Sequence, residues 1–318
     1  MKIRSMLGLT VAAIALTAAG GAMAQSMPKA VIGMSGWTGF APLSLAEKAG
    51  LFKKHGVDVE VKFIPQKERH LALAAGSVQV IATTVDTQIA YAASGVELTQ
   101  ILLLDKSKGG DGIAVRANIN SLAELKGKQV AVDGAGTTPY FTFAYMLKKN
   151  GLTPKDFTLN TLSPQAAATA FVAGQFDAAV TYEPYLSQIR AKPESGKILF
   201  TTLDYPVVVD TVSMHPKYIE ANPAVAKGIV NGFFDALEMI AKEPDKSYEI
   251  MGSVVKQSGP DFAKSASYIA WQDRAANKAY FADGMNQFLE EAAQVQLETG
   301  VIRQIPDLKK LVDTRFLD

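Results

Sequence analysis

The chain has 318 residues, 48% of them hydrophobic and 20% charged, with 32 Lys and Arg residues against 31 Asp and Glu residues. This length and balance suit a globular protein of one or two domains, and a net charge of +1 supplies no basic face for nucleic acid. The absence of cysteine excludes disulfides, cysteine nucleophiles and thiolate metal sites.

The first 24 residues have the pattern of a secretory signal peptide. Lys2 and Arg4 precede an apolar run over residues 6–19, and Ala22-Met23-Ala24 is an A-x-A cleavage signal. The run is short for a membrane span, and no later stretch reaches that length without charges or turn residues. We therefore expect cleavage between Ala24 and Gln25 and a soluble periplasmic protein without a lipid anchor.

Strands and helices alternate after this segment, which predicts parallel βα units. The helix ends at His55-Gly56, and the strand that follows alternates strictly between apolar and polar residues. The expected elements of this half are strands at 30–34, 57–63 and 78–82 and helices at 41–54 and 66–75.

A second half repeats the pattern, with a strand at 129–132 and a helix at 140–149. Residues 52–57 match residues 147–152 at an offset of 95, and residues 73–78 match residues 171–176 at an offset of 98. Each half then ends a strand in threonine followed by a carboxylate. Two such halves predict two lobes that face each other.

The alternation of strands and helices ends after Asp210, and residues 217–300 are predicted to be largely helical. If the chain crosses between lobes near Gly112 and Val212, it forms a two-strand hinge. Lobe 1 then comprises 25–112 and 212–318, and lobe 2 comprises 113–211. We expect an α/β fold in which each lobe is a mostly parallel sheet flanked by helices.

Several segments carry a family resemblance that covers nearly the whole mature chain. They are Pro42–Val57, Leu73–Val80, Lys106–Asp111, Leu122–Lys128 and Tyr182–Tyr185. With them, the chain resembles the periplasmic solute-binding proteins of ABC importers of the nitrate/sulfonate/taurine type, which share their fold with thiamine-pyrimidine-precursor binding proteins. The resemblance implies a small-molecule ligand, and an ABC permease with its ATPase in the inner membrane as partners. We expect a monomer without cofactor or metal.

Two loops at predicted strand ends are candidates for anion binding. Ser35, Gly36, Trp37 and Thr38 lie in the first, and Gly136, Thr137 and Thr138 lie in the second. In open α/β sheets ligands bind outside the carboxyl ends of the strands, and N–H groups and hydroxyls at helix starts donate to anions. Ordinary helix capping by Ser or Thr is the alternative.

Carboxylates and aromatic residues lie at the same strand ends. Asp86, Asp111, Glu183 and Asp210 favour an ammonium or amino-heterocycle donor, although each could instead cap a helix or pair with a lysine, and Asp111 could belong to the hinge. The candidate anion-binding loops and these carboxylates together suit an aminosulfonate. Thr84 joins the predicted ligand contacts, and Trp37, Tyr140, Tyr182 and Tyr185 could form an aromatic wall, while Trp271 is expected in the core.

No catalytic set is present in the sequence. His55, His70 and His215 share no metal-binding spacing, and the G-x-S-x-G elbow is absent. The fold relatives that make pyrimidine precursors use histidine and cysteine, so an enzyme is the lesser alternative to a binding protein. A ligand-sensing module for a chemoreceptor or sensor kinase is the other. Sulfonate, nitrate-like anion, amine and pyrimidine ligands all stay open.

Overall fold

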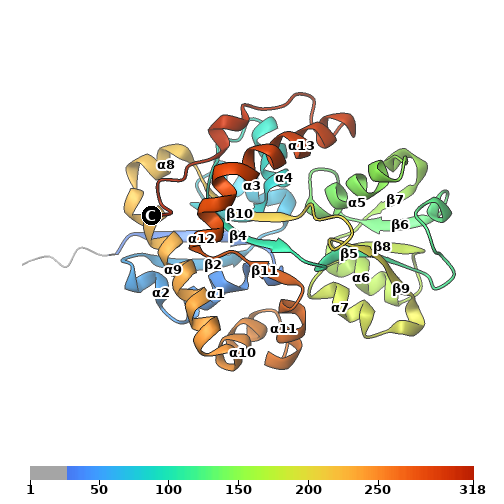
Figure 1. Cartoon of the computed structure of the whole chain (residues 1–318), viewed down its shortest axis with the longest axis horizontal. Helices are drawn as coiled ribbons and strands as arrows, with labels where there is room; N and C mark the ends of the chain where they lie inside the picture. The colour runs from blue at the N-terminus through green and yellow to red at the C-terminus, as the bar shows by residue number, and fades with distance from the viewer. Residues whose placement is uncertain (1–26) are drawn as a thin grey trace, which may run out of the picture.

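The computed structural model describes residues 27–318, so the predicted signal peptide lies outside the described residues. Two separate sheets organise this part of the chain into two lobes (Figure 1). The first sheet has the order β11-β4-β10-β3-β1-β2 and the second has the order β7-β6-β8-β5-β9. The strands of the first sheet are β1 (Lys29–Met34), β2 (Asp58–Phe63), β3 (Val80–Thr84), β4 (Thr99–Ser107), β10 (Val209–Met214) and β11 (Ile269–Trp271). Those of the second are β5 (Asp111–Val115), β6 (Gln129–Val132), β7 (Thr158–Thr161), β8 (Ala178–Tyr182) and β9 (Lys197–Thr201).

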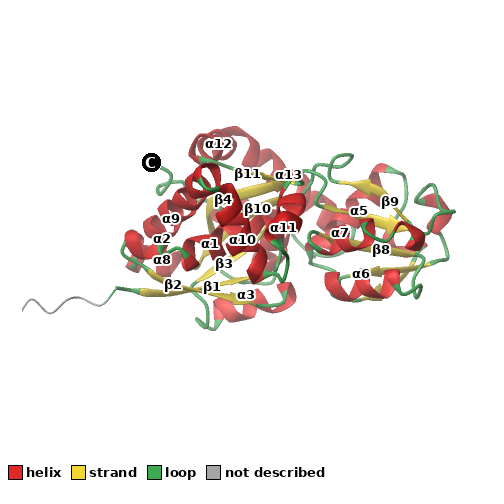
Figure 2. Cartoon of the chain, turned by 90° about the horizontal axis from the view of Figure 1, so that it is seen from below, coloured by secondary structure: helices red, strands yellow, loops and turns green. Residues whose placement is uncertain are grey.

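Helices cover both lobes, and the helical C-terminal part belongs to the lobe of the first sheet (Figure 2). The helices of that lobe are α1 (Ala41–Lys48), α2 (Leu51–Lys54), α3 (Gln66–Ala74), α4 (Val85–Ala93), α8 (Pro216–Ala221), α9 (Pro223–Lys242), α10 (Pro244–Val254), α11 (Gly259–Ala266), α12 (Arg274–Ala279) and α13 (Met285–Glu298). Those of the other are α5 (Thr138–Lys149), α6 (Pro164–Val172) and α7 (Tyr185–Arg190). None of these helices in residues 27–318 is long and apolar enough to cross a membrane.

Two local predictions differ from the structure. The helix expected at 41–54 is divided into α1 and α2 because Gly50 adopts a φ of 71°, a left-handed conformation that interrupts the helix. The helical C-terminal part also contains the three-residue strand β11, which pairs antiparallel with β4.

The order of the strands repeats in the two lobes, as the matching segments predict. The parallel core is β2-β1-β3 in one sheet and β7-β6-β8 in the other. Gly56 and Gly151, which correspond at the offset of 95, both have positive φ, at 77° and 68°. Each glycine lets the chain turn sharply from a helix toward the next strand.

Each sheet is mixed rather than mostly parallel, and the reason lies in the crossover strands. β4 runs out of the first sheet and continues into β5 of the second, and the chain returns from β9 into β10. Both β10 and β5 pair antiparallel with their neighbours. The strands that enter each sheet from the other lobe, β10 and β5, therefore run against the parallel core, whereas β4 and β9, which lead out of it, run with it.

The two crossings lie at 108–110 and 202–208, and they are hydrogen-bonded to each other. The hydroxyls of Ser107 and Thr202 are 2.7 Å apart, and the Gly109 amide donates to Thr202 Oγ1 at 2.8 Å. Asp111 and Gly112 belong to the second sheet, and 209–211 to the first, so both crossings fall slightly earlier than the predicted points. The connection between the lobes is therefore a double strand held together by side chains.

Separate cores stabilise the two lobes. In the first lobe Phe52 is fully buried, and a Cβ on Gly232 of α9 would lie 2.4 Å from its ring, so helices α2 and α9 pack closely. In the second lobe apolar residues cover both faces of the sheet, with Phe143 in one cluster and Phe171 in the other. Burying such aromatic side chains contributes about 2–3 kcal/mol each to holding each lobe together.

Candidate functional site

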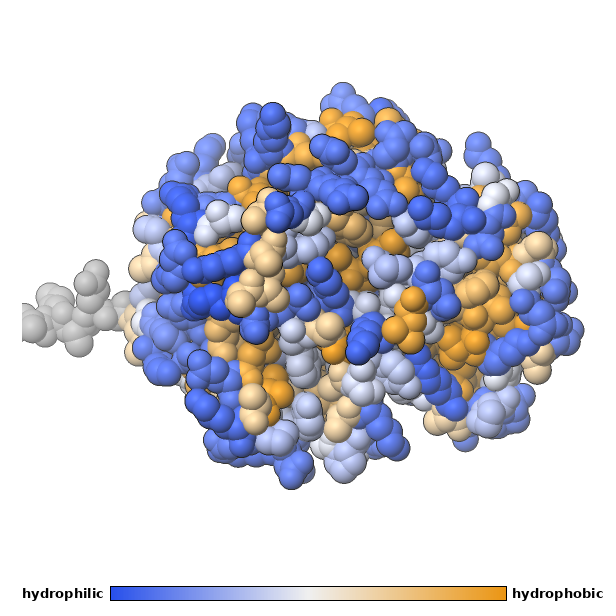
Figure 3. Space-filling model, in the orientation of Figure 1, coloured by the Kyte–Doolittle hydropathy of each residue, from blue (hydrophilic) through white to orange (hydrophobic). Residues whose placement is uncertain are grey.

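A small cavity lies between the two lobes. The space-filling view shows the lobes in contact, with a notch in the lower outline between them (Figure 3). Both sheets contribute to the cavity, which is lined by Ser35, Trp37, Phe40, Gln66, Arg69, Thr84, Asp111, Thr138, Tyr182, Val208 and Asp210. Six of these were predicted from the sequence as ligand contacts: Ser35, Trp37, Thr84, Asp111, Thr138 and Asp210.

The carboxyl ends of parallel strands account for the position of this cavity. Ser35 directly follows β1, Thr84 ends β3, and Tyr182 ends β8 of the second sheet. Thr138 begins helix α5 after strand β6. Because both sheets present these ends to each other, the loops that follow the strands meet between the lobes.

Hydroxyl and amide groups join the lobes across the cavity. Gln66 Nε2 lies 2.8 Å from Thr138 Oγ1, and the Thr138 backbone N–H donates to Gln66 Oε1 at 3.3 Å. The hydroxyls of Thr84 and Thr138 are 2.7 Å apart. The site is thus formed by both lobes, and these polar groups can exchange partners when a ligand oxygen enters.

Arg69 places a buried positive charge at the cavity wall. The residue is only 1% exposed. Its Nε donates to the carbonyl oxygen of Ile64 at 2.9 Å and its Nη1 to that of Ala82 at 2.8 Å. Burial lowers its pKa, yet a guanidinium stays charged in proteins. The ion pairs found within residues 27–318 do not include Arg69, although the charges of Asp210 and Asp133 act on it, so the cavity offers a guanidinium to an anionic group.

Buried carboxyl groups form the opposite electrostatic feature. Asp111 and Asp210 line the cavity, and Asp86 and Asp105 lie behind it, all at most 3% exposed. Among the described residues, neither oxygen of Asp210 has a hydrogen-bond partner, nor does Oδ2 of Asp111. Unpartnered buried acceptors are costly, and an ammonium or N–H-rich group would satisfy them.

Burial controls the protonation of these groups. It raises the pKa of Asp111 to about 8 and that of Asp86 to about 7, because a charged carboxylate loses its hydration in this environment. The pKa of Asp210 is raised well above its ordinary value, first by burial and then by the neighbouring carboxylates. The acidic end of the empty cavity therefore holds protons near neutral pH.

Three of the four predicted wall aromatics lie together. The rings of Trp37 and Tyr182 meet edge to face, with centroids 5.5 Å apart, and Tyr185 lies 5.8 Å from Tyr182. Trp37 comes from the lobe of the first sheet and the tyrosines from the other, so the wall spans both lobes. Tyr140 lies apart, in a groove beside Leu159 and Leu297.

The structure does not bring seven predicted residues to the cavity wall: Gly36, Thr38, Asp86, Gly136, Thr137, Tyr140 and Glu183. Thr38 is fully buried in a short 3-10 helix, and Asp86 is buried within α4 behind the cavity. The hydroxyl of Thr137 donates to the carbonyl oxygen of Gly134 at 2.8 Å, so it closes the turn before α5. Its side chain makes no capping hydrogen bond to α5, so the capping alternative does not describe this residue.

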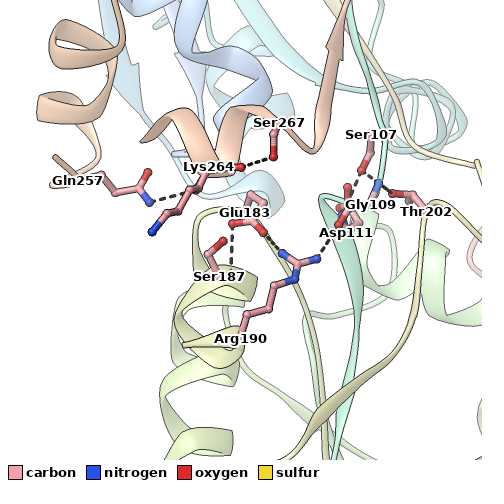
Figure 4. Close-up of polar contacts among 11 residues, drawn as sticks. Ser107, Gly109, Asp111, Glu183, Ser187, Arg190, Thr202, Gln257, Lys264 and Ser267 are labelled. Atoms are coloured by element: carbon pink, nitrogen blue, oxygen red, sulfur yellow. Dashed lines mark hydrogen bonds and ion pairs between the residues drawn. The ribbon is translucent and has the colours of Figure 1, made fainter. Parts of the chain in front are cut away.

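Glu183 has an intramolecular partner. Its fully buried carboxylate pairs with Arg190 of α7, whose Nη2 also donates to the Gly109 carbonyl oxygen at 2.9 Å (Figure 4). The Arg190 guanidinium lies 4.1 Å from the ring centre of Tyr268. This arrangement connects the second lobe to the crossing and to the first lobe, instead of facing a ligand.

Sequence reasoning missed Phe40, Gln66, Arg69 and Val208. Gln66 and Arg69 occupy the first turn of α3, one turn apart, directly after the strand β2 and Ile64-Pro65. Their spacing at a strand end could have identified them, since residues three apart lie on one face of a helix. Phe40 and Val208 are apolar residues in irregular segments and carry no comparable signal.

Comparison with known proteins places the chain in a family. Residues 37–247, which include most of the cavity lining, match the model of the family described as NMT1/THI5 like. The chain belongs to this family. The match covers strands β2, β3, β4 and β10 of the first sheet and all of the second sheet.

Curated relatives of this family member span nearly its whole length. It is 26% identical over 297 residues to the taurine-binding periplasmic protein of Escherichia coli, covering 88% of this chain and 90% of that protein. It is also 26% identical over 285 residues to a putative aliphatic sulfonates-binding protein of Bacillus subtilis, covering 87% and 84%. These relatives are binding proteins.

Solved structures share the two-lobed fold. The alkanesulfonate-binding protein SsuA of Xanthomonas axonopodis pv. citri, bound to MOPS, has a TM-score of 0.76 at 18% identity and covers 92% of this chain and 100% of that one. The nitrate-binding protein NrtA of Synechocystis has a TM-score of 0.73 at 17% identity, covering 90% and 86%. The predicted periplasmic-binding-protein fold is thereby confirmed.

Proposed function

We propose that this family member is the extracytoplasmic solute-binding component of an ABC importer, and that its ligand is a small molecule with an amino group at one end and an acidic group at the other, such as an aminosulfonate. The ligand enters between the lobes, is held by residues of both, and is delivered to a membrane permease whose ATPase supplies the energy. The likeness to taurine- and sulfonate-binding relatives supports this function.

The single observation that carries the ligand class is the polarity of the cavity. Arg69 offers a guanidinium without an ion-pair partner in the described chain, and Ser35, Thr84 and Thr138 of the lining offer hydroxyl donors. The carboxyl groups of Asp111 and Asp210 carry buried oxygens without partners in the described chain. A ligand with two opposite charges satisfies both groups, whereas nitrate would leave the carboxyl oxygens unpaired.

Lobe closure follows from the architecture. We place lobe 1 on the first sheet and its C-terminal helices and lobe 2 on 111–201, with the segments 108–110 and 202–208 as the hinge. Contacts such as Gln66 with Thr138 join the lobes only when they approach, and a ligand that bridges the same walls favours the closed form by its differential affinity. The closed form is the one that would dock on the permease.

We assign binding rather than catalysis to the cavity. No histidine is among its lining residues, and His70 stacks on Tyr91 with ring centres 4.7 Å apart, outside it. Without a histidine or cysteine the lining supplies no activated nucleophile of the common kinds. Taurine recovered unchanged after prolonged incubation supports this assignment, and a product in that incubation contradicts it.

Isothermal titration calorimetry of the purified mature protein tests the proposed ligand class. Taurine, ethanesulfonate and nitrate form a series that removes first the amine and then the organic part. We expect taurine to bind at least tenfold more tightly than ethanesulfonate and nitrate to bind most weakly. Equal or tighter binding of nitrate or ethanesulfonate would overturn the two-ended ligand.

Localisation and assembly are part of the proposal. Mass spectrometry of the protein from a periplasmic extract should give an N-terminus at Gln25, as the cleavage signal predicts. Transport of taurine into vesicles that contain the permease and ATPase encoded beside this gene should depend on added binding protein. Adjacent genes for a chemoreceptor or sensor kinase, without a permease, would favour the sensing alternative.

A further inference from the structure

Two carboxyl groups, one at the cavity wall and one behind it, face each other without a hydrogen-bond donor between them. Asp105 of β4 and Asp210 of β10 are register partners on adjacent antiparallel strands. Both are at most 1% exposed, and residues directly opposite each other on antiparallel strands project from the same face of the sheet, so the two carboxyl groups lie close together. Two ionised carboxylates offer only acceptors, so this buried contact lacks a hydrogen unless one group is protonated.

The remaining oxygens of this pair identify which end faces a ligand. Asp105 Oδ1 accepts a hydrogen bond from Trp37 Nε1 at 3.3 Å, while its Oδ2 has no partner among the described residues. Neither Asp210 oxygen has one, and Asp210 lines the cavity whereas Asp105 does not. Asp105 therefore acts behind Asp210, between it and the indole of the aromatic wall.

Charged groups on the neighbouring elements α4, β5, α3 and β4 surround the Asp105–Asp210 pair. Asp86 of α4 and Asp111 of β5 add negative charge, and Arg69 of α3 adds positive charge on the Asp210 side. Lys106, next along β4, has its ammonium 3.9 Å from the ring centre of Tyr280. Burial raises the pKa of both members of the pair, and the neighbouring carboxylates raise that of Asp210 further. These surroundings favour retention of a proton.

We infer that Asp105 and Asp210 share one proton in the ligand-free protein, and that the ammonium group of the ligand expels this proton to solvent when it binds. The inference rests on the proposed function for its ligand, but the shared proton is a property of the empty site. The exchange balances, since one proton leaves as one ligand cation enters. Asp105 thereby becomes a positioning residue that sets the charge the site accepts without touching the ligand.

Tryptophan fluorescence of the ligand-free protein tests the shared proton. The chain has two tryptophans, and the Trp37 indole donates to Asp105. We expect the emission to change in one transition between pH 5 and pH 9, and Asp105→Asn and Trp37→Phe each to abolish it. Asp58→Asn, the same substitution at a half-exposed position of β2, should leave it unchanged. A wild-type emission that is constant over this range overturns the inference without reference to any ligand.

Calorimetry of taurine binding in two buffers of different ionisation heat tests the exchange. We expect the wild-type protein to release about one proton per taurine below the transition, and its affinity to rise about tenfold per pH unit. In Asp105→Asn, proton release should fall below half and the affinity should vary little with pH. Binding of taurine by the wild-type protein without proton release overturns the exchange. If taurine and other amines do not bind but the fluorescence transition is present, the proposed ligand fails and the shared proton stands.

Discussion

The substitution Asp210→Asn should separate ligand affinity from stability. Asparagine preserves the shape of the side chain but is neutral, so it offers the ligand's ammonium an amide oxygen in place of a carboxylate. A hydrogen bond between charged groups contributes about 1.5–3 kcal/mol, because one or both partners are ionised. Its loss corresponds to a dissociation constant for taurine about 10- to 150-fold higher. Titration calorimetry at pH 8 measures this change directly.

The same variant should be more stable than the wild-type protein when ligand is absent. Burial raises the pKa of Asp210 well above its ordinary value, so at pH 8 the wild-type pair must keep a proton that the unfolded chain has lost, and this costs stability. The amide of the substituted side chain can donate to Asp105, its register partner, and relieve part of that cost. We expect a gain of about 1 kcal/mol, or a melting midpoint about 2 °C higher.

Asp210→Asn should weaken taurine binding but raise stability, and these opposite directions make the reasoning refutable. Asp58→Asn on β2, half-exposed and paired with Lys53 at 3.2 Å, is the matched control and should alter neither quantity. An Asp210→Asn protein that binds taurine within threefold of the wild type would show that Asp210 does not hold the amine. A lowered midpoint would show that the carboxyl group contributes structure rather than a ligand contact.

Three further outcomes follow from the geometry. Gly39→Ala should lower the free energy of unfolding by about 1–3 kcal/mol in urea, since a Cβ would lie 2.2 Å from Trp37 Nε1, whereas Gly36→Ala, with no atom closer than 3.5 Å, should have little effect. Glu291→Gln removes a carboxylate of α13 that accepts a hydrogen bond at 2.9 Å from Tyr145 of α5 in the other lobe. Calorimetry should then show that the affinity for taurine is a few-fold weaker. An unchanged affinity would mean that this contact plays no part in closure. Since burial raises the pKa of Asp111 to about 8, the folded protein holds a proton that the unfolded chain loses near pH 4, and thermal melts without ligand should show stability falling from pH 4 to pH 8, a slope that Asp111→Asn should reduce.

Strand ends were the part of the site that the sequence could predict. Thr84 was identified because an apolar strand ends there, and Asp111 and Asp210 because they lie at predicted crossover points; all three line the cavity. The repeated segments also predicted two equivalent lobes, which the strand orders β2-β1-β3 and β7-β6-β8 bear out. Hydrophobic periodicity and turn residues are local signals, so they locate elements and their ends well.

Tertiary partners were beyond the reach of the same signals. Glu183 directly follows strand β8, and Asp210 lies near the start of β10, so the two carboxylates look alike in the sequence. In the structure, however, Arg190 of α7 pairs with Glu183. Asp105 lies within a buried strand and looks like any interruption of an apolar run, although its register partner is Asp210. Which carboxylate meets a cation and which meets another carboxylate depends on strand pairing, and a single sequence does not encode that pairing locally.

The C-terminal helices of the first lobe contribute no residue to the cavity lining, whose last member along the chain is Asp210. The C-terminal part of this lobe nevertheless supplies Tyr268, which packs on Arg190, Trp271 of β11, whose indole donates to the Gly39 carbonyl oxygen at 3.0 Å, and Glu291 of α13 opposite α5. The residues that line the cavity and the residues that hold the lobes together thus come from different segments of the chain. Substitutions after β10 are therefore expected to change the rate of ligand release without changing which ligand is bound.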